Sequence, residues 1–283
     1  MSDELKAKEI GRDIVLNTGV DIDVCVHGSI DSTNVWALQQ SKQGKKIPFA
    51  CFAEQQTHGK GRRGKSWLTL PNANIAMSLV WVFDLSSQRI NLLPLTIALA
   101  VVRTLEALGL QKVKLKWPND VYVNARKIAG ILIETQPLNK ALAPSENAVA
   151  VIIGVGLNYD MSSFQAEMID ESMASLVLTD VCSELENKRP ARQLVASLLL
   201  QNIVEVCQDF DGLVEENLNQ FRQHYDFCKN EHVQLVLDNG DVLTGVALGV
   251  TDEAELVVKV GQEERVFNSA EVSVKARSVT GNI

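Results

Sequence analysis

A short basic segment restricts the fold of this chain more than any other part of the sequence. Residues 58–67 read HGKGRRGKSW, which places four permanent cations and three glycines within ten residues. Glycine lets backbone N–H groups approach a ligand closely, and cations at this density repel one another unless an anion lies among them. We therefore interpret the segment as a loop that binds a polyphosphate or an acyl phosphate, and not as a solvated basic loop.

The same segment matches the pattern of a P-loop, but its context does not. Gly59 to Ser66 satisfies G-x-x-x-x-G-K-[ST]. A P-loop lies between a strand and a helix whose N-terminus points at the phosphates. A strand is predicted over residues 47–53, but residues 67–74 have no helical period, and Pro71 with its following asparagine predicts a turn. We therefore reject a P-loop NTPase fold, in spite of the matching letters.

The rest of the sequence predicts an α+β fold with a mixed sheet and packed helices. Apolar runs predict strands over residues 21–30, 47–53, 75–83, 113–117, 121–123, 127–134 and 148–157. Helices are predicted after the cap residues 31–34, over residues 88–108, and over residues 191–210. The core-facing stripe of the last helix contains Val195, Leu199, Ile203, Val206 and Phe210.

The character of the sequence changes after Cys228. Short strands are predicted over residues 233–237, 242–250, 256–260, 265–267 and 272–274, and Asn239-Gly240 is a hairpin signal. These strands predict a small closed barrel. We expect a short N-terminal segment over residues 1–23, a large domain over residues 24–228 and the barrel over residues 229–277. Residues 1–21 are expected to carry at most one or two helical turns.

Composition excludes several classes of protein. The chain has 283 residues, enough for two domains, and its 46% hydrophobic and 22% charged residues are ordinary for a globular protein. A net charge of −8 argues against a general nucleic-acid binder. No run of eighteen apolar residues is present, and the N-terminal residues lack an apolar signal region. We therefore expect a cytoplasmic protein that does not span a membrane.

The cysteines lie far apart in the sequence and form no C-x-x-C pair. In a cytoplasmic protein this pattern favours reduced, buried thiols over disulfides or a zinc site. The five residues are Cys25, Cys51, Cys182, Cys207 and Cys228.

Two further segments place polar residues at the ends of predicted strands. In residues 116–120, KWPND, proline ends the strand, so Asn119 and Asp120 can face a cleft, although Pro-Asn-Asp is also ordinary turn chemistry. Residues 154–158, GVGLN, contain a lone G-x-G, which is a weak signal because no third glycine opens a helix after it. Neither segment defines a site by itself.

Residues 126–134, RKIAGILIE, carry the third candidate group. Lys127 lies among apolar neighbours, so it is a candidate buried cation that needs a carboxylate or phosphate partner. Gly130 inside a strand suggests the close approach of a ligand or of another backbone. The alternative is an ordinary lysine on an edge strand.

Taken together, five segments in this order resemble the biotin protein ligase family. The segments are residues 31–34, 59–67, 116–120, 127–134 and 154–158. The short C-terminal strands resemble the terminal domain of that family, so the resemblance covers roughly residues 24–277. It implies a catalytic domain of the class II synthetase-like, biotin/lipoate ligase type and a C-terminal SH3-like barrel.

The resemblance also implies a reaction in two steps. Biotin and ATP form biotinyl-5′-AMP, and the biotinyl group then passes to a lysine of the biotin carboxyl carrier protein of acetyl-CoA carboxylase. Mg²⁺ is the implied cofactor, and a homodimer is compatible with the family. Binding of DNA or of a membrane is not expected.

The family's site residues carry over onto matching positions. Arg62 and Lys127 are the expected catalytic residues, and Asp120 is the candidate Mg²⁺ ligand. The residues expected to contact biotin are Ser32, Thr33, Asn34, Gln56, Lys60, Gly61, Arg62, Lys127 and Gly130. Those expected to contact ATP or the adenylate are Gly59, Arg63, Gly64, Lys65, Trp67, Asn119 and Asn158.

The chain departs from the family pattern in its loop. The family loop commonly reads G-R-G-R-x-G-R-x-W, whereas Lys60 and Lys65 replace two of these arginines here. Lysine keeps the charge but loses the bidentate geometry of a guanidinium. We expect catalysis to survive, with weaker retention of the adenylate.

Two related functions remain as alternatives. Some family members also repress biotin-synthesis genes through an N-terminal DNA-binding domain, which needs on the order of 60 residues. Only 23 residues precede the expected large domain, so we predict a ligase without the repressor function. A lipoate protein ligase shares the chemistry, but that family's Arg-Arg-x-Ser-Gly-Gly-Gly loop is absent from the sequence.

Overall fold

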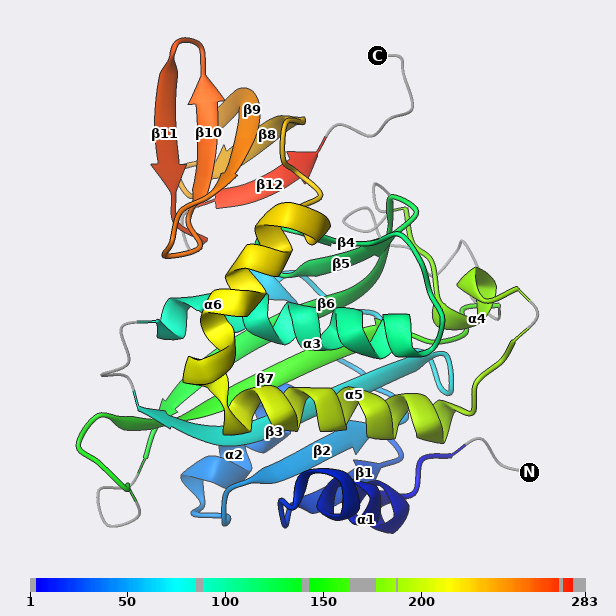
Figure 1. Ribbon diagram of the computed structural model, residues 1–283. Helices are drawn as coiled ribbons and strands as arrows, with labels where there is room; N and C mark the ends of the chain where they lie inside the picture. The colour runs from blue at the N-terminus through cyan, green and yellow to red at the C-terminus, as the bar shows by residue number, and fades with distance from the viewer. Residues whose placement is uncertain are drawn as a thin grey trace.

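Two sheets organise the molecule (Figure 1). The computed structural model describes residues 4–84, 89–138, 143–162, 177–186, 188–269 and 272–276. A mixed sheet of seven strands forms the larger part, and an antiparallel sheet of five strands forms the C-terminal part. This arrangement confirms the predicted α+β class.

The large sheet has the strand order β1-β2-β3-β7-β6-β5-β4. β1 pairs with β2 in parallel, and every other neighbouring pair is antiparallel. The strands are β1 (Asp23–His27), β2 (Phe49–Ala53), β3 (Asn74–Asp84), β4 (Val113–Lys116), β5 (Asp120–Val123), β6 (Arg126–Pro137) and β7 (Ala148–Asn158). All seven predicted strands are present, with ends that differ by a few residues.

Helices cover both faces of this sheet. One face packs against α3 (Leu93–Ala107), α5 (Arg192–Gln208) and α6 (Phe210–Gln220), and it forms the main core (Figure 1). The opposite face is covered by α2 (Thr33–Lys42), where Ala37 packs among Phe49, Val80 and Ile152 in a smaller apolar cluster. Short helical turns lie at η1 (Arg62–Gly64), η2 (Ile90–Leu92), α4 (Val181–Glu184) and η4 (Phe221–Tyr225).

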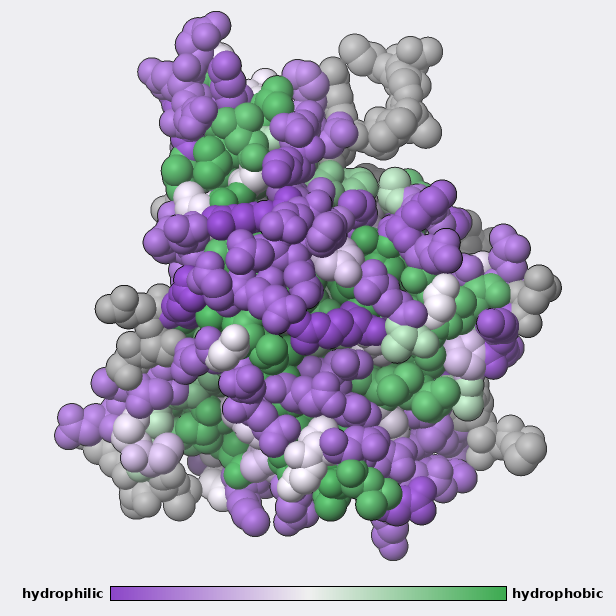
Figure 2. Space-filling model, in the orientation of Figure 1, coloured by the Kyte–Doolittle hydropathy of each residue, from purple (hydrophilic) through white to green (hydrophobic). Residues whose placement is uncertain are grey.

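The apolar character of α3 comes from its place in the core. Residues 90–107 are long and apolar enough to cross a membrane by length and composition, but 67% of this stretch is buried inside the fold. The surface on this side of the molecule is mostly hydrophilic, with small apolar patches (Figure 2). These features are typical of a core helix. The residue at which the sequence predicts this helix to start, Gln88, lies outside the described residues.

The prediction for the N-terminal residues is wrong. They form α1 (Ala7–Thr18), a helix of 12 residues, and not one or two turns. Ile10 and Ile14 lie one helical turn apart, are fully buried, and pack against the layer that contains α5. The helix ends at Gly19, whose φ of +72° suits glycine at a helix C-terminus.

The predicted helix over residues 191–210 is confirmed as α5, except that its last residue, Phe210, begins the next helix, α6. α5 ends at Gln208, and α6 begins at Phe210, so the chain turns at Asp209. The ring of Phe210 then packs edge-on against Phe83, with centroids 5.7 Å apart. The spacing of apolar residues along the sequence could not indicate this tertiary contact.

The C-terminal sheet has the order β11-β10-β9-β8-β12 and is antiparallel throughout. Its strands are β8 (His232–Leu237), β9 (Val242–Val250), β10 (Leu256–Val260), β11 (Glu263–Phe267) and β12 (Val272–Ala276). All five predicted strands are present. The last residue of the predicted barrel, residue 277, lies outside the described residues.

The burial of α1 gives a testable prediction. Ile14→Ala should lower the free energy of unfolding by about 2–5 kcal/mol, because it leaves a cavity between α1 and the core. Denaturation by urea measures this change. Leu16→Ala is the matched control, because Leu16 is 74% exposed and its truncation should cost less than about 0.5 kcal/mol. Equal losses in the two variants would contradict the packing of α1.

Candidate active site

The basic segment forms a small hairpin on the α2 side of the sheet. Gly61 N–H donates to Lys65 O at 2.7 Å, and Trp67 N–H donates to Gly59 O at 2.8 Å. No helix follows: the next regular element after the turn η1 is β3. The rejection of a P-loop is therefore confirmed by the local structure.

The indole of Trp67 lies flat on the sheet where two strands carry glycine. Gly130 of β6 and Gly156 of β7 are register partners. A Cβ at Gly156 would overlap the indole, and one at Gly130 would lie 3.2 Å from it. Only the absence of side chains at this pair lets the ring come so close. The indole Nε1 is buried and has no hydrogen-bond partner among the described residues.

Cations gather around one carboxylate beside this ring. Lys127 Nζ lies 2.7 Å from Asp120 Oδ1 and 5.5 Å from the centroid of the Trp67 ring. Arg62 donates to Asn119 Oδ1 at 3.3 Å. The charge of Asp120 also acts on Arg62 and on Lys116. We call Arg62, Lys116, Lys127 and Asp120 the cationic cluster.

Burial raises the free-energy cost of keeping the side chains of this cluster charged. The pKa of Lys116 is lowered mainly by burial, although Asp120 partly offsets the effect. Burial likewise lowers the pKa of the Arg62 guanidinium. Three cations face one carboxylate, so the cluster carries a net positive charge that an anionic ligand would offset.

A β-bulge brings Lys127 into the cluster. Val121 pairs with Ala129, but Tyr122 pairs with Lys127, so Ile128 has no partner on β5. The extra residue turns Lys127 to the face that carries Asp120 and sends Ile128 into the core, where it is fully buried.

Hydroxyl, amide and carboxyl side chains form a second group on the same face. Gln56 Oε1 accepts from Thr33 N–H at 2.8 Å and from Thr33 Oγ1 at 3.1 Å. Ser78 Oγ lies 2.8 Å from Thr33 Oγ1 and 2.5 Å from Asn34 Oδ1. Asn34 Nδ2 donates to Glu134 Oε2 at 2.8 Å. We call Thr33, Asn34, Gln56, Thr69, Ser78 and Glu134 the polar network; its other bond joins Gln56 Nε2 to Thr69 Oγ1 at 3.0 Å.

The start of α2 is held by this network. Ser32, one of the four predicted cap residues, is the N-cap of α2, but its side chain makes no capping bond, and Thr33 and Asn34 already belong to the helix. Gln56 accepts the first helical N–H, that of Thr33, in its place. A side chain from a neighbouring segment therefore replaces the local cap and fixes the hydroxyl of Thr33.

The polar network and the cationic cluster lie next to each other. Asn34 lies against Gly154 of β7, and Trp67 lies against Gly156, two residues further along the strand. Side chains two residues apart share one face of a strand. A Cβ at Gly130 would meet the indole of Trp67, Lys127 Nζ and Asp120 Oδ1, so the indole lies between the two groups.

The loop arginines reach the C-terminal sheet. Arg62 donates to the carbonyl oxygen of Ser269. Arg63 forms an ion pair with Asp238. Trp117 Nε1, in the KWPND segment, donates to Ala254 O at 2.8 Å. The C-terminal part therefore contacts both the hairpin and the KWPND segment, which ends at Asp120.

Some of the expected site residues do not join either group. Lys60, Gly64 and Lys65 are exposed on the hairpin. Asn158 is buried, and its side chain is bonded to Asn74 Nδ2 at 3.0 Å and to Thr179 O at 3.0 Å. Its amide joins structural segments, and its contact with a nucleotide stays a prediction.

The sequence reasoning missed four members of these groups. Thr69, Ser78 and Glu134 belong to the polar network, and Lys116 belongs to the cationic cluster. A signal for Ser78 was available, because a fully buried serine in an apolar strand needs a polar partner. Glu134 gave a similar signal at the end of an apolar run.

The cysteines are free thiols, as expected. Cys51, Cys207 and Cys228 are buried, whereas Cys25 and Cys182 are only half-buried. Two of the cysteines are neighbours in space although they lie far apart in the sequence. Cys25 and Cys51 are register partners in β1 and β2.

Comparison with known proteins finds two matching families and several relatives. Residues 26–158 match the Biotin/lipoate A/B protein ligase family, and residues 230–275 match the Biotin protein ligase C terminal domain. The biotin–[acetyl-CoA-carboxylase] ligase of Mycobacterium tuberculosis is 30% identical over 85% of each chain. The bifunctional ligase/repressor BirA of Escherichia coli is 26% identical over 89% of this chain and 74% of its own.

A solved structure shares the fold. The biotin protein ligase of Aquifex aeolicus in complex with biotin and ATP superposes with a TM-score of 0.70, at 23% identity over 89% of this chain and 98% of that one. The fold and the first family match define the biotin/lipoate ligase class. With the C-terminal match and the Mycobacterium tuberculosis relative, the chain belongs to the biotin protein ligase family.

The glycine pair gives a second prediction. Gly156→Ala should displace the Trp67 indole, because the new methyl group would occupy its place. The indole N–H signal of Trp67 in an NMR spectrum, identified by its loss in Trp67→Phe, should therefore shift. Gly28→Ala is the control, because a Cβ there meets nothing within 4 Å. An unchanged Trp67 signal in Gly156→Ala would contradict the contact.

Proposed function

We propose that this chain forms biotinyl-5′-AMP from biotin and ATP and then transfers the biotinyl group to a lysine of a carrier protein. One observation carries the proposal: the polar network adjoins the cationic cluster on one sheet face, with Trp67 between them. The hydroxyl and amide groups of the polar network suit the ring system of biotin, and the cationic cluster suits a carboxylate and a phosphate.

The polar network supplies the contacts for the biotin ring. A ureido group offers two N–H donors and one carbonyl acceptor. Hydroxyl and amide groups of Thr33, Asn34 and Gln56 offer both donors and acceptors in fixed directions. A network of bonds holds these side chains in place before the ligand arrives, which lowers the entropy lost on binding.

The cationic cluster allows two anions to meet. A carboxylate oxygen of biotin attacks the α-phosphorus of ATP, the bond to the β-phosphate oxygen breaks, and pyrophosphate leaves. Coulomb repulsion between the reactants opposes this approach. Lys127 lies beside Trp67 and Asp120 and offsets the carboxylate charge, while Arg62 stabilises the charge that develops on the phosphate.

Mg²⁺ enters this scheme as the complex with ATP. Asp120 is the carboxylate within the cationic cluster, and its Oδ1 contacts Lys127. A single carboxylate fits an ion that is bound mainly by phosphates and water. Asp120 would hold the ion beside the triphosphate, where the ion supplies further positive charge.

The hairpin protects the product of the first step. Biotinyl-5′-AMP is a mixed anhydride that water would hydrolyse, so it needs a cover until the acceptor lysine arrives. The hairpin contacts the C-terminal sheet through Arg62 and Arg63. The unpartnered indole N–H of Trp67 leaves a donor for the adenylate.

In the second step the neutral amine of the acceptor lysine attacks the biotinyl carbonyl. The carbon–oxygen bond to AMP breaks, AMP leaves, and the amine proton passes to solvent or base. The biotin carboxyl carrier protein of acetyl-CoA carboxylase is the acceptor we propose, since relatives are named for that enzyme. We assign residues 24–228 to the catalytic domain and 229–277 to the C-terminal domain, and we place the protein in the cytoplasm, where its free thiols stay reduced.

A competition assay tests the proposed function. The chain is incubated with Mg²⁺, ATP and an apo carrier domain, together with equal concentrations of biotin and lipoate. The mass of the carrier domain is then measured by mass spectrometry. We expect a mass increase for one biotinyl group, only when ATP is present. Incorporation of lipoate in its place would assign the chain to the other branch of the class.

Arg62 provides a sharper test of the mechanism. Arg62→Ala should slow single-turnover formation of biotinyl-5′-AMP by roughly 10²–10³-fold, the usual cost of removing one preorganised electrostatic contact. Quenched-flow measurement of pyrophosphate gives this rate. Arg265→Ala is the control, because within the part of the chain that the structure describes Arg265 forms an ion pair only with Glu263 of its own strand. An unchanged rate and unchanged retention of the adenylate in Arg62→Ala would remove Arg62 from the mechanism.

A further inference from the structure

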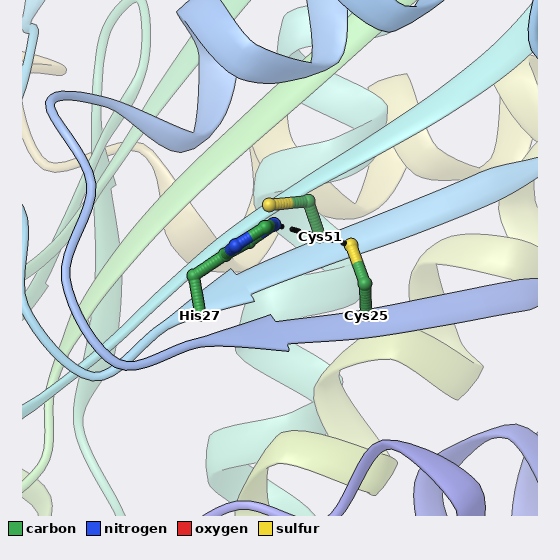
Figure 3. A group of neighbouring side chains, drawn as sticks. All are labelled: Cys25, His27 and Cys51. Carbon is green, nitrogen blue, oxygen red and sulfur yellow. Dashed lines mark hydrogen bonds between the residues drawn. The ribbon is translucent and has the colours of Figure 1, made fainter.

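Three metal-ligating side chains meet at the edge of the large sheet, beside α2. Cys25 and His27 lie two residues apart on β1, so they share one face of the strand. Cys51 of β2 is the register partner of Cys25. Figure 3 shows the two thiols and the imidazole turned toward one another. The ligase chemistry uses none of these groups.

The distances between the three ligand atoms suit the binding of one metal ion by all three side chains. Cys25 Sγ lies 3.6 Å from His27 Nε2, and the three ligand atoms all lie within 4.8 Å of one another. In a tetrahedral zinc site, with bonds of about 2.3 Å to sulfur and about 2.0–2.1 Å to nitrogen, sulfur and nitrogen are about 3.6 Å apart. Only a small movement of Cys51 is therefore needed.

We propose that Cys25, Cys51 and His27 bind one soft metal ion, Zn²⁺ or Cu⁺. Thiolate and imidazole ligands select these two ions over Mg²⁺ or Ca²⁺. Three protein ligands complete a trigonal site for Cu⁺, or leave one tetrahedral position of Zn²⁺ for water. The two thiolates balance the charge of Zn²⁺, and binding releases their protons.

The surroundings hold the imidazole in position. The ring of Trp36 packs edge-on against His27 with centroids 4.8 Å apart, which fixes the imidazole. The neighbours Lys45, which is half-buried, and Asp23, which is exposed, pair with each other and add little net charge.

An ion can reach the site from solvent. β1 is the edge strand of the sheet, and Cys25 and His27 are half-buried. Once bound, the ion would join β1 to β2 next to α2, which carries Thr33 and Asn34 of the polar network. The metal would stabilise this edge of the sheet and take no part in the ligase reaction.

Binding is measured on the full chain, reduced and freed of metal by a chelator. Co²⁺ serves as the spectroscopic probe of a zinc site. One equivalent should produce thiolate-to-cobalt charge-transfer bands with the intensity of two thiolates. Zn²⁺ should displace the cobalt, and an anaerobic competition with a Cu⁺ chelator gives the copper affinity. The site is assigned to the ion, Zn²⁺ or Cu⁺, that binds with the higher affinity.

Variants make the result specific. Cys25→Ser and His27→Gln should each weaken binding by at least about 10–100-fold, the loss seen when even an outer-shell partner is removed. Both residues are half-buried, so the fold should tolerate the changes, and thermal unfolding checks this. Cys182→Ser is the matched control, because Cys182 is also a half-buried thiol but lies on α4. It should bind metal as the parent does.

Differential alkylation gives an independent readout. Bound Zn²⁺ should protect Cys25 from iodoacetamide and leave Cys182 reactive, as mass spectrometry would show. The proposal fails if neither ion binds at one equivalent, if Cys182→Ser abolishes binding as Cys25→Ser does, or if the only change at this site is a Cys25–Cys51 disulfide formed under oxidant. These outcomes are separate from the ligase activity, which Cys25→Ser should retain.

Discussion

The packing of the Trp67 indole on Gly130 and Gly156 determines how the rest of the site is arranged. These glycines face each other across β6 and β7, and the ring lies where their side chains would otherwise stand. The ring separates the polar network from the cationic cluster, yet keeps both on one face. A ligand that spans the two groups must have a neutral head and an anionic tail. Biotinyl-5′-AMP has that form.

A second constraint is the charge of the cluster. Arg62, Lys116 and Lys127 lie around one carboxylate, Asp120, and burial lowers the pKa of Arg62 and of Lys116. Such an arrangement is costly in the free protein, and an anionic substrate relieves the cost. The contact of Arg62 with Ser269 links this charge balance to the C-terminal sheet. The C-terminal part therefore contacts the proposed active site.

Much of this organisation could be predicted from the sequence, because motif order and local turn chemistry are properties of neighbouring residues. Pro71 excluded a helix after the basic segment, and the structure has none there. Register could not be predicted. The bulge at Ile128 reverses the face of Lys127, and the pairing of β1 with β2 joins Cys25 to Cys51. Both depend on contacts between strands, which alternation along one strand does not encode.

A crystal structure with a non-hydrolysable analogue of biotinyl-5′-AMP tests the central claim most directly. The account predicts that the biotin ring contacts Thr33 and Asn34 above Gly154, and that the phosphate lies within hydrogen-bond distance of Lys127 Nζ. The hairpin should close over the phosphate through Arg62. An analogue bound elsewhere, with Lys127 still paired only with Asp120, would contradict the account.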